Sequence, residues 1–126
     1  MQEELPNKSA AVVEDKKIIE YLLNENHPVG GSKAKFFLSK GYNVNDIRAF
    51  RKTLLYHANN NAVKSIKTTP YGTTYIIEGY ITHYGYPGYP SNLKNLKEKP
   101  TVFNLRTIWS IGNNDFIPKL VTAYPI

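Results

Sequence analysis

The sequence contains no cysteine among its 126 residues, which excludes disulfide bonds, thiolate catalysis and zinc sites built on cysteine. No apolar run approaches the roughly 20 residues that a membrane-spanning helix needs, so we expect no contact with a membrane. The acidic N-terminus lacks the apolar segment of a signal peptide. These absences fit a reducing compartment, and we expect a cytoplasmic protein.

The residue patterns of common metal and nucleotide sites are also missing. The ten carboxylates are scattered, and the three histidines, His27, His57 and His83, lie far apart in the sequence. No H-E-x-x-H, Walker-type Gly-Lys-Ser/Thr or G-x-S-x-G signature is present. A metal-dependent nuclease needs clustered acids to hold its ions, so we expect neither a metal ion nor a cofactor.

Positive charge is in excess. The formal net charge is +6 and the isoelectric point is near 9.4. A basic balance in a small protein favours a polyanionic partner, usually nucleic acid, or an acidic protein. The alternative is a solvated basic surface without a specific partner. The ten tyrosines allow stacking on bases, but they are equally suited to strands and interfaces.

Hydrophobic periodicity divides the chain into a helical half and a strand half. It predicts helices over residues 12–24, 33–40 and 46–59, the last two capped by Ser32 and Asn45, with Gly41 ending the second. Alternation predicts strands over residues 62–69, 73–82, 101–111 and 116–124. We therefore expect one α+β domain over residues 1–126, in which the N-terminal helices pack on one face of a four-stranded antiparallel meander sheet. Residues 1–11 are expected to be loose.

Alternation also predicts which side chains of the last two strands point away from the helices. Large apolar residues mark the core side of strand 101–111, which sends Arg106 to the open face. In the last strand we expect Val121 and Ala123 under the helices. A one-residue error in register would reverse this assignment. The residues predicted on the open face of the last strand are Leu120, Thr122 and Tyr124.

Residues 24–37, which we call the elbow, combine turn chemistry with cations and a histidine. The His27-Pro28 step and Gly30-Gly31 predict a stiff turn. Lys33 and Lys35 follow in the first turn of a helix, where cations oppose the helix dipole and an anion would be favourable. The alternative for a lone histidine before proline is a residue that closes the turn by hydrogen bonding.

Metal-independent RNA cleavage needs few residue types. A base takes the 2′-hydroxyl proton, an acid protonates the leaving 5′-oxygen, and cations stabilise the pentacoordinate phosphorane. The elbow and the open sheet face supply these types: the histidine as base or acid, the lysines and arginine around the phosphate, and the threonine and tyrosine as positioning or protonating groups. The candidate catalytic residues are His27, Lys33, Lys35, Arg106, Thr122 and Tyr124.

A long loop at residues 84–100 interleaves tyrosine with lysine. This pattern suits single-stranded RNA, whose bases stack on aromatic rings while cations neutralise its phosphates. A solvated insertion or an oligomer contact is the alternative. His83, at the root of this loop, is a second choice for a catalytic histidine, and His57 is expected to be structural. The candidate RNA-binding residues are Tyr86, Tyr89, Lys94 and Lys97.

Five short motifs carry a family resemblance that covers roughly residues 16–126. They are Tyr21-Leu22-Leu23-Asn24, His27-Pro28-x-Gly30-Gly31-x-Lys33-Ala34-Lys35-Phe36-Phe37, Thr69-Pro70-Tyr71-Gly72-Thr73, Arg106-Thr107-x-Trp109-x-Ile111 and Pro118-Lys119-Leu120-Val121-Thr122-Ala123-Tyr124-Pro125. Together they resemble a bacterial family of uncharacterised domains that occur alone and at the C-termini of polymorphic toxins. Here Glu25 stands where the family often has proline, and the tyrosine-rich loop is longer than usual.

The order of helices followed by four strands is similar to the toxin ribonuclease superfamily that groups barnase, EndoU, colicin E5 and RelE. This likeness is one of layout only. It implies a site on the open sheet face, built from a histidine or lysine of the helical part and from arginine, threonine or tyrosine of the strands. It also implies a ribonuclease toxin that acts on RNA in the cytoplasm, or is delivered into the cytoplasm of a target cell, with an acidic antitoxin or immunity protein as partner.

Two other classes of function stay open at this point. A non-catalytic module would bind RNA or a protein through the tyrosine- and lysine-rich loop and the open sheet face. A structural component of a larger assembly would bury the open face in a stable oligomer.

Overall fold

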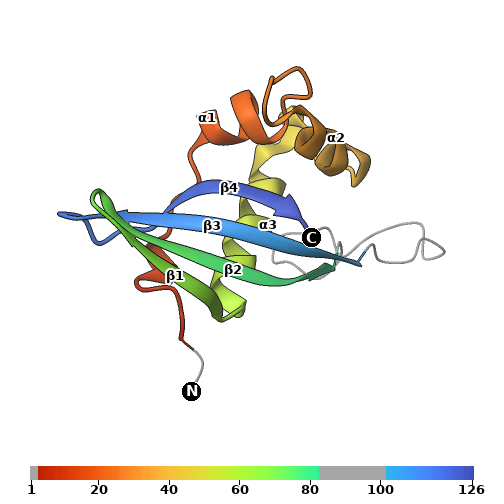
Figure 1. Ribbon diagram of the computed structural model, residues 1–126. Coiled ribbons are helices and arrows are strands. Elements are labelled where there is room, and N and C mark those ends of the chain that lie inside the picture. Colours follow the sequence, from red (N-terminus) through yellow and green to blue (C-terminus); the bar gives the residue numbers. More distant parts are fainter. Residues whose placement is uncertain (1–2, 83–101) are drawn as a thin grey trace.

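Four strands form one antiparallel sheet in the order β1-β2-β3-β4, which confirms the predicted meander (Figure 1). The strands are β1 (Val63–Thr69), β2 (Gly72–Thr82), β3 (Val102–Gly112) and β4 (Lys119–Pro125). The last strand starts later than predicted. The Asp115 carboxylate accepts hydrogen bonds from the amides of Phe116 and Ile117, and the Pro118 nitrogen has no proton to donate to a strand ladder.

The computed structural model describes residues 3–82 and 102–126. Three α-helices and three 3₁₀- or π-helical turns all precede the sheet in the described residues, which confirms the α+β class. None of these helices is long and apolar enough to cross a membrane. The predicted RNA-binding residues Tyr86, Tyr89, Lys94 and Lys97, and the second-choice histidine His83, lie outside the described part of the chain. The helical elements are η1 (Lys8–Ala10), α1 (Asp15–Lys17), η2 (Ile18–Leu22), α2 (Gly31–Ser39), η3 (Val44–Asp46) and α3 (Ile47–Asn60).

The first predicted helix, residues 12–24, is much shorter in the structure. Val12 instead forms a bridge with Lys119 at the start of β4. After the single turn of α1 the chain widens into the π-helical turn η2, closed by a 2.9 Å hydrogen bond from the Leu23 amide to the Ile18 carbonyl. Such π turns are rare and are often found at functional sites.

The ends of the other two helices differ in detail from the prediction. Helix α2 begins at Gly31 with Gly30 as its N-cap, so Ser32 lies inside the helix and caps nothing. Helix α3 is capped by Asp46, not Asn45, through a 3.4 Å hydrogen bond from the amide three residues ahead. Gly41 follows α2 with a φ of 96°, as expected of a residue that ends a helix in the left-handed conformation.

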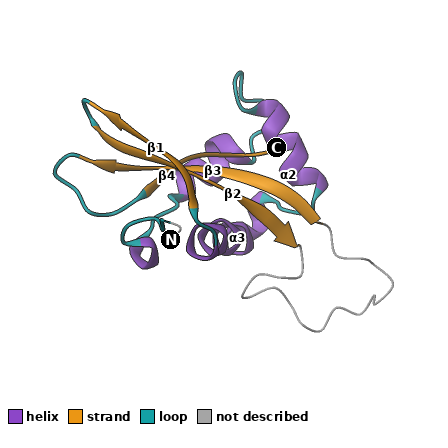
Figure 2. Ribbon diagram, turned by 60° about the horizontal axis from the view of Figure 1, so that its bottom comes forward, coloured by secondary structure: helices purple, strands orange, loops and turns teal. Residues whose placement is uncertain are grey.

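The helices occupy two places around the sheet. Figure 2 shows α3 lying against one face of the sheet, where Phe50 and Leu54 are fully buried together with Leu105 and Trp109 of β3. Helices α1 and α2 lie beyond the edge strand β4 (Figure 1). The face opposite α3 is the open face. Residues from α2 and η2 that reach over β4 can therefore meet side chains of the open face.

Residues 3–11 are attached to the rest of the chain, which differs from the loose segment that we expected. Leu5 is only 2% exposed and belongs to the hydrophobic core. The Glu3 carbonyl accepts a 2.7 Å hydrogen bond from the Val63 amide at the start of β1. This segment thus contributes a buried apolar side chain to the core, which its mostly polar composition did not predict.

His57 is a buried structural residue on α3, as predicted. Its Nε2 lies 2.9 Å from the Leu105 carbonyl oxygen and 3.2 Å from that of Gly79, so Nε2 must carry the proton. Its Nδ1 then accepts from the Thr107 hydroxyl at 2.9 Å, and Thr107 in turn accepts from the Trp109 indole N–H at 2.9 Å. This chain of hydrogen bonds fastens α3 to the centre of the sheet.

A β-bulge interrupts the pairing of β3 with β4. Ile108 lies opposite Thr122, but the next residue, Trp109, lies opposite Leu120. Val121 is therefore the extra residue on β4, with no partner on β3. The alternation of side chains between the two faces of the sheet is therefore shifted by one residue at the bulge.

The bulge decides which predicted orientations in β4 are correct. Leu120 is 6% exposed and belongs to the core, whereas Val121 is 41% exposed. The predicted faces of these two residues are wrong, because the alternation of a regular strand does not allow for the bulge. Ala123 is buried as predicted, and Thr122 and Tyr124 lie opposite open-face residues of β3.

Candidate functional site

Three side chains line up across the open face at the same level of the sheet. Glu78 of β2 pairs with Arg106 of β3, and Arg106 pairs with Tyr124 of β4. The guanidinium of Arg106 donates through Nε to the Glu78 carboxylate at 2.7 Å, with a second bond from Nη2, and through Nη1 to the Tyr124 hydroxyl at 3.1 Å. The Tyr124 hydroxyl and the Glu78 carboxylate raise the pKa of Arg106 above its ordinary value, so it is a permanent cation.

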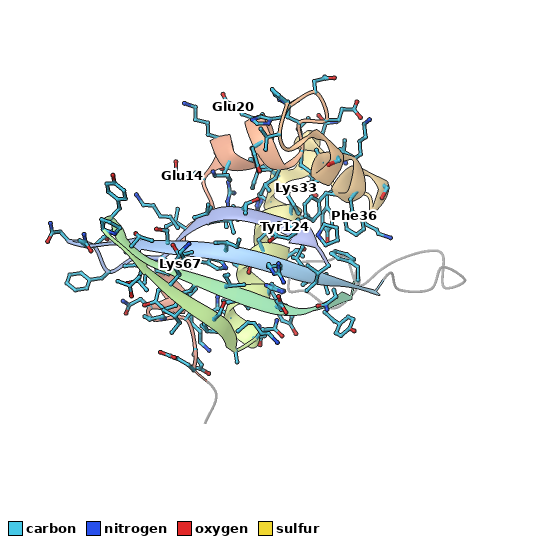
Figure 3. All side chains as sticks on the ribbon, in the orientation of Figure 1. Glu14, Glu20, Lys33, Phe36, Lys67 and Tyr124 are labelled. Carbon is cyan, nitrogen blue, oxygen red and sulfur yellow. The ribbon has the colours of Figure 1, made fainter. Side chains whose placement is uncertain are left out.

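Lys33 of α2 brings a second cation to the same place. Its Nζ lies 4.7 Å from the centroid of the Tyr124 ring, and the Arg106 guanidinium carbon lies 5.5 Å from that centroid. Both cations are thus held by the π face of one tyrosine. Figure 3 shows Lys33 and Tyr124 close together where α2 meets the end of β4. The elbow and the open face therefore do converge.

Tyr21, in the π-helical turn η2, joins Lys33 to Thr122. The Lys33 ammonium donates to the Tyr21 hydroxyl at 3.4 Å. The Thr122 hydroxyl lowers the pKa of Tyr21 below its ordinary value, and Lys33 and Lys17 lower it further. The Thr122 Oγ1 is itself buried and receives no hydrogen bond of standard geometry. Thr122 therefore brings a buried hydroxyl of β4 next to the phenol of Tyr21.

We refer to six side chains from five elements as the site cluster. It joins η2 and α2 of the helical half to β2, β3 and β4 of the sheet through the contacts described above. Its members are Tyr21, Lys33, Glu78, Arg106, Thr122 and Tyr124.

His27 closes the elbow and supports the ring of Tyr21. Its Nδ1 accepts hydrogen bonds from the amides of Val29 and Gly30, both at 3.0 Å, and its carbonyl accepts from Gly31 at 3.0 Å. Three consecutive amides of the turn that leads into α2 are thereby satisfied by one residue. The imidazole stands edge-on to Tyr21 with ring centroids 4.8 Å apart.

The two glycines of the elbow allow the close packing of this region. A Cβ on Gly30 would lie 3.0 Å from Cε2 of Tyr21, so the backbone rests directly on the tyrosine ring. A Cβ on Gly31 would lie 2.6 Å from the Glu25 carbonyl oxygen. The first contact positions Tyr21, and the second fixes the path of the turn.

We expect Gly31→Ala to lower the free energy of unfolding by about 1–3 kcal/mol, because a methyl group would overlap a backbone carbonyl that cannot easily move. Chemical denaturation measures the change. Gly112→Ala is the matched control, since a Cβ there would meet no atom closer than 3.8 Å and should change stability little. Equal effects of the two substitutions would contradict the steric argument.

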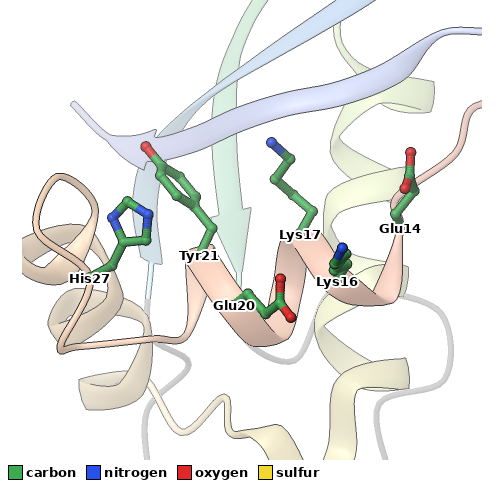
Figure 4. Close-up of a pocket in the computed structure, with 6 residues that line it drawn as sticks. All are labelled: Glu14, Lys16, Lys17, Glu20, Tyr21 and His27. Carbon is green, nitrogen blue, oxygen red and sulfur yellow. The ribbon is translucent and has the colours of Figure 1, made fainter.

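A surface pocket of about 540 Å³ adjoins the cluster on the side of α1 and η2 (Figure 4). Tyr21 and His27 form one wall, and the other lining side chains are charged. Tyr21 thus lies between this pocket and the cations of the cluster. The lining residues are Glu14, Lys16, Lys17, Glu20, Tyr21 and His27.

The structure brings together four of the six residues predicted as catalytic and connects a fifth to them. Lys33, Arg106, Thr122 and Tyr124 belong to the cluster, and His27 reaches it through the ring of Tyr21. Lys35 does not join them. It is exposed on α2 and forms no hydrogen bond, ion pair or ring contact with the described residues.

The sequence did not indicate two members of the cluster. Tyr21 is part of a family motif, but its position in a π turn does not follow from hydrophobic spacing. Glu78 faces Arg106 because of the β2–β3 register. Two features of the sequence could have pointed to Glu78. It lies on the polar side of an alternating strand, and it is the sole carboxylate between residues 47 and 97.

The described residues also include no group of three or more histidine, aspartate or glutamate side chains that could hold a metal ion. The chain matches, over residues 4–126, the model of a family described as Domain of unknown function (DUF6883). It belongs to this family. The match covers every residue of the site cluster of this DUF6883 chain. No curated protein and no solved structure matches the chain.

Proposed function

We propose that this protein is a metal-independent ribonuclease that cleaves RNA by attack of the 2′-hydroxyl on the neighbouring phosphodiester. The observation that carries the proposal is the convergence of Lys33 and Arg106, from opposite halves of the fold, on Tyr124 and beside two further hydroxyl groups. Two fixed cations next to hydroxyl donors suit a phosphate that gains negative charge in the transition state.

Glu78, Arg106 and Tyr124 lie side by side on three adjacent strands. Strands lie about 4.8 Å apart, so the three residues span about 10 Å of the open face. Arg106 and Lys33 would bind the non-bridging phosphate oxygens, and the hydroxyls of Thr122 and Tyr124 would orient them. The Glu78 carboxylate, held by Arg106, would accept the proton of the 2′-hydroxyl.

His27 receives a supporting role in this proposal. Its Nδ1 accepts from two backbone amides, which places the proton of the neutral ring on Nε2. To exchange a proton at Nε2, the ring would have to be protonated at Nδ1, and both hydrogen bonds to the elbow would be lost. His27 therefore serves best as the residue that holds the turn and the Tyr21 ring.

The proposed biological setting is that of a toxin that a partner protein neutralises. The motifs resemble domains found alone and in polymorphic toxins, and the net charge of +6 favours an acidic protein as a neutralising partner. We propose an antitoxin or immunity protein that covers the site cluster with carboxylates. Such a partner would compete with RNA for Lys33 and Arg106.

We expect the wild-type protein to cleave RNA in the presence of EDTA, and Arg106→Ala and Lys33→Ala to reduce kcat/KM by about 10–100-fold each through lost phosphate binding. Lys35→Ala is the matched control, because it removes the same charge two residues away from Lys33 without touching the cluster. Its activity should stay within about threefold of wild type. Gel analysis of labelled RNA and of the 2′,3′-cyclic phosphate end provides the measurement.

Two results would refute the proposal. One is the absence of cleavage by folded wild-type protein across a range of RNA sequences. The other is undiminished cleavage by both Arg106→Ala and Lys33→Ala. RNA binding without cleavage would instead support the alternative of a non-catalytic RNA-binding module.

A further inference from the structure

We propose that Tyr21 is the general acid that protonates the leaving 5′-oxygen, and that the adjoining pocket on α1 and η2 holds the leaving nucleoside. The assignment rests on the proposed ribonuclease function. It names a catalytic residue and a subsite for that reaction, neither of which the sequence predicts.

The position of the Tyr21 hydroxyl supports this role. It lies 3.4 Å from the Lys33 ammonium, and Lys33 also contacts the ring of Tyr124, where Arg106 is bound. A phosphate held between Lys33 and Arg106 would therefore lie next to the phenol. The buried hydroxyl of Thr122 lies on the other side of the phenol and acts on its pKa.

The ring of Tyr21 is held in place on several sides. The imidazole of His27 stands against it at 4.8 Å, and the backbone of Gly30 packs on its Cε2 edge. The π-helical turn that carries Tyr21 displaces the side chain from the position that a regular helix would give it. A proton donor needs this restriction, because misplacement by about 1 Å can cost about 100-fold in rate.

The charges around Tyr21 favour its ionised product. Lys33 approaches from α2, and the ammonium of Lys17 on α1 lies 5.4 Å from the ring centroid. These cations and the Thr122 hydroxyl lower the pKa of Tyr21, although partial burial opposes them. Glu14 and Glu20 line the pocket beside the ring and are the nearby anions. A phenol with a lowered pKa is a stronger acid, and its phenolate is stabilised once the proton has left.

The pocket determines which tyrosine faces the leaving group. Tyr124 is bound to Arg106 on the far side of Lys33 and does not line the pocket, whereas Tyr21 forms part of its wall. The pocket volume of about 540 Å³ is large enough for a nucleoside, and Lys16 and Lys17 at its rim suit the next phosphate along the strand. The leaving nucleoside would then lie against Tyr21 and not against Tyr124.

The proposed step conserves atoms and charge. The 2′-oxygen forms a bond to phosphorus as its proton passes to the Glu78 carboxylate. The bond from phosphorus to the 5′-oxygen breaks, and that oxygen takes the proton of the Tyr21 hydroxyl. The products are a 2′,3′-cyclic phosphate, a free 5′-hydroxyl, a neutral Glu78 and a Tyr21 phenolate. Proton exchange with water restores the two side chains.

The test compares two kinds of leaving group in Tyr21→Phe. The substrates are RNA, whose leaving 5′-oxygen needs a proton, and the 3′-(4-nitrophenyl phosphates) of the four ribonucleosides, whose nitrophenolate leaves without one. We expect Tyr21→Phe to lose about 100-fold in rate on RNA but to stay within about threefold of wild type on the nitrophenyl esters. Its affinity for RNA should be unchanged within about twofold, because only one hydroxyl is removed.

Two matched variants and a folding control complete the experiment. Tyr124→Phe removes the competing hydroxyl of the cluster and should affect both substrate classes alike. Tyr71→Phe removes a hydroxyl from an 86%-exposed ring and should have no effect. Thermal unfolding of all three variants checks that the fold is intact.

Each outcome decides between the two proposals. If wild type cleaves neither substrate, the ribonuclease function fails and this assignment with it. If wild type is active and Tyr21→Phe cleaves RNA at the wild-type rate, only the assignment of Tyr21 fails. Equal losses on RNA and on the nitrophenyl esters would also overturn it, as would a leaving-group effect confined to Tyr124→Phe.

Discussion

Trp109→Ala is expected to lower the free energy of unfolding by about 3–5 kcal/mol, which is a large part of the 5–15 kcal/mol typical of a small domain. The indole of Trp109 is completely buried between the sheet and α3. Its removal deletes apolar contact and leaves a cavity. The Thr107 hydroxyl also loses the 2.9 Å hydrogen bond that the indole N–H of Trp109 donates to it.

Urea denaturation followed by circular dichroism measures this effect. Fluorescence is unsuitable because Trp109 is the one tryptophan of the sequence. Tyr71→Ala is the control, since its ring is 86% exposed at the β1–β2 turn and contributes little burial. A loss below about 1 kcal/mol for Trp109→Ala would show that the core reorganises around this position.

Lowering the pH from 7 to 4 is expected to cost about 3 kcal/mol of stability through His57 alone. Burial lowers the pKa of His57 from the ordinary 6.5 to about 4. The unfolded chain therefore binds a proton at this residue more readily than the folded chain does. The stabilising contribution is complete above pH 6.5 and is lost as the pH falls from 6.5 towards 4.

The pH dependence can be assigned to His57 by substitution. His57→Gln cannot titrate, so its free energy of unfolding should vary less between pH 6.5 and 4 than that of wild type, although it will be less stable at pH 7. Lys35→Gln serves as the control, because it changes an exposed side chain of α2 and should leave the steep dependence in place. Equal slopes for His57→Gln and wild type would contradict the buried, neutral state of His57.

Much of the fold follows from local patterns in the sequence. The switch from helical spacing to loose alternation near residue 62 predicts the α+β order, and the turn residues predict the meander. Alternation in β3 also places Arg106 correctly opposite the buried side chains of Leu105, Thr107 and Trp109. These features depend only on neighbours in the sequence, which is why they could be predicted.

The missed features depend on contacts between distant residues. Val121 resembles any other β-branched strand residue, so nothing local marks it as a bulge. Glu78 meets Arg106 only because β2 and β3 pair in one particular register. Tyr21 approaches Lys33 because a π turn and the elbow rotate their elements towards each other. Each of these geometries is set by tertiary packing.

The bulge at Val121 shifts the alternation of side chains by one residue partway along β4. Before it, the strand supplies Leu120 to the core; after it, the strand presents Thr122 and Tyr124 to the opposite side. The residues of β4 before the bulge and those after it thus point to opposite faces of the sheet when they are counted by alternation. In a regular strand Leu120, Thr122 and Tyr124 would share one face, so the bulge is what allows Leu120 to enter the core while Thr122 and Tyr124 lie on the open face.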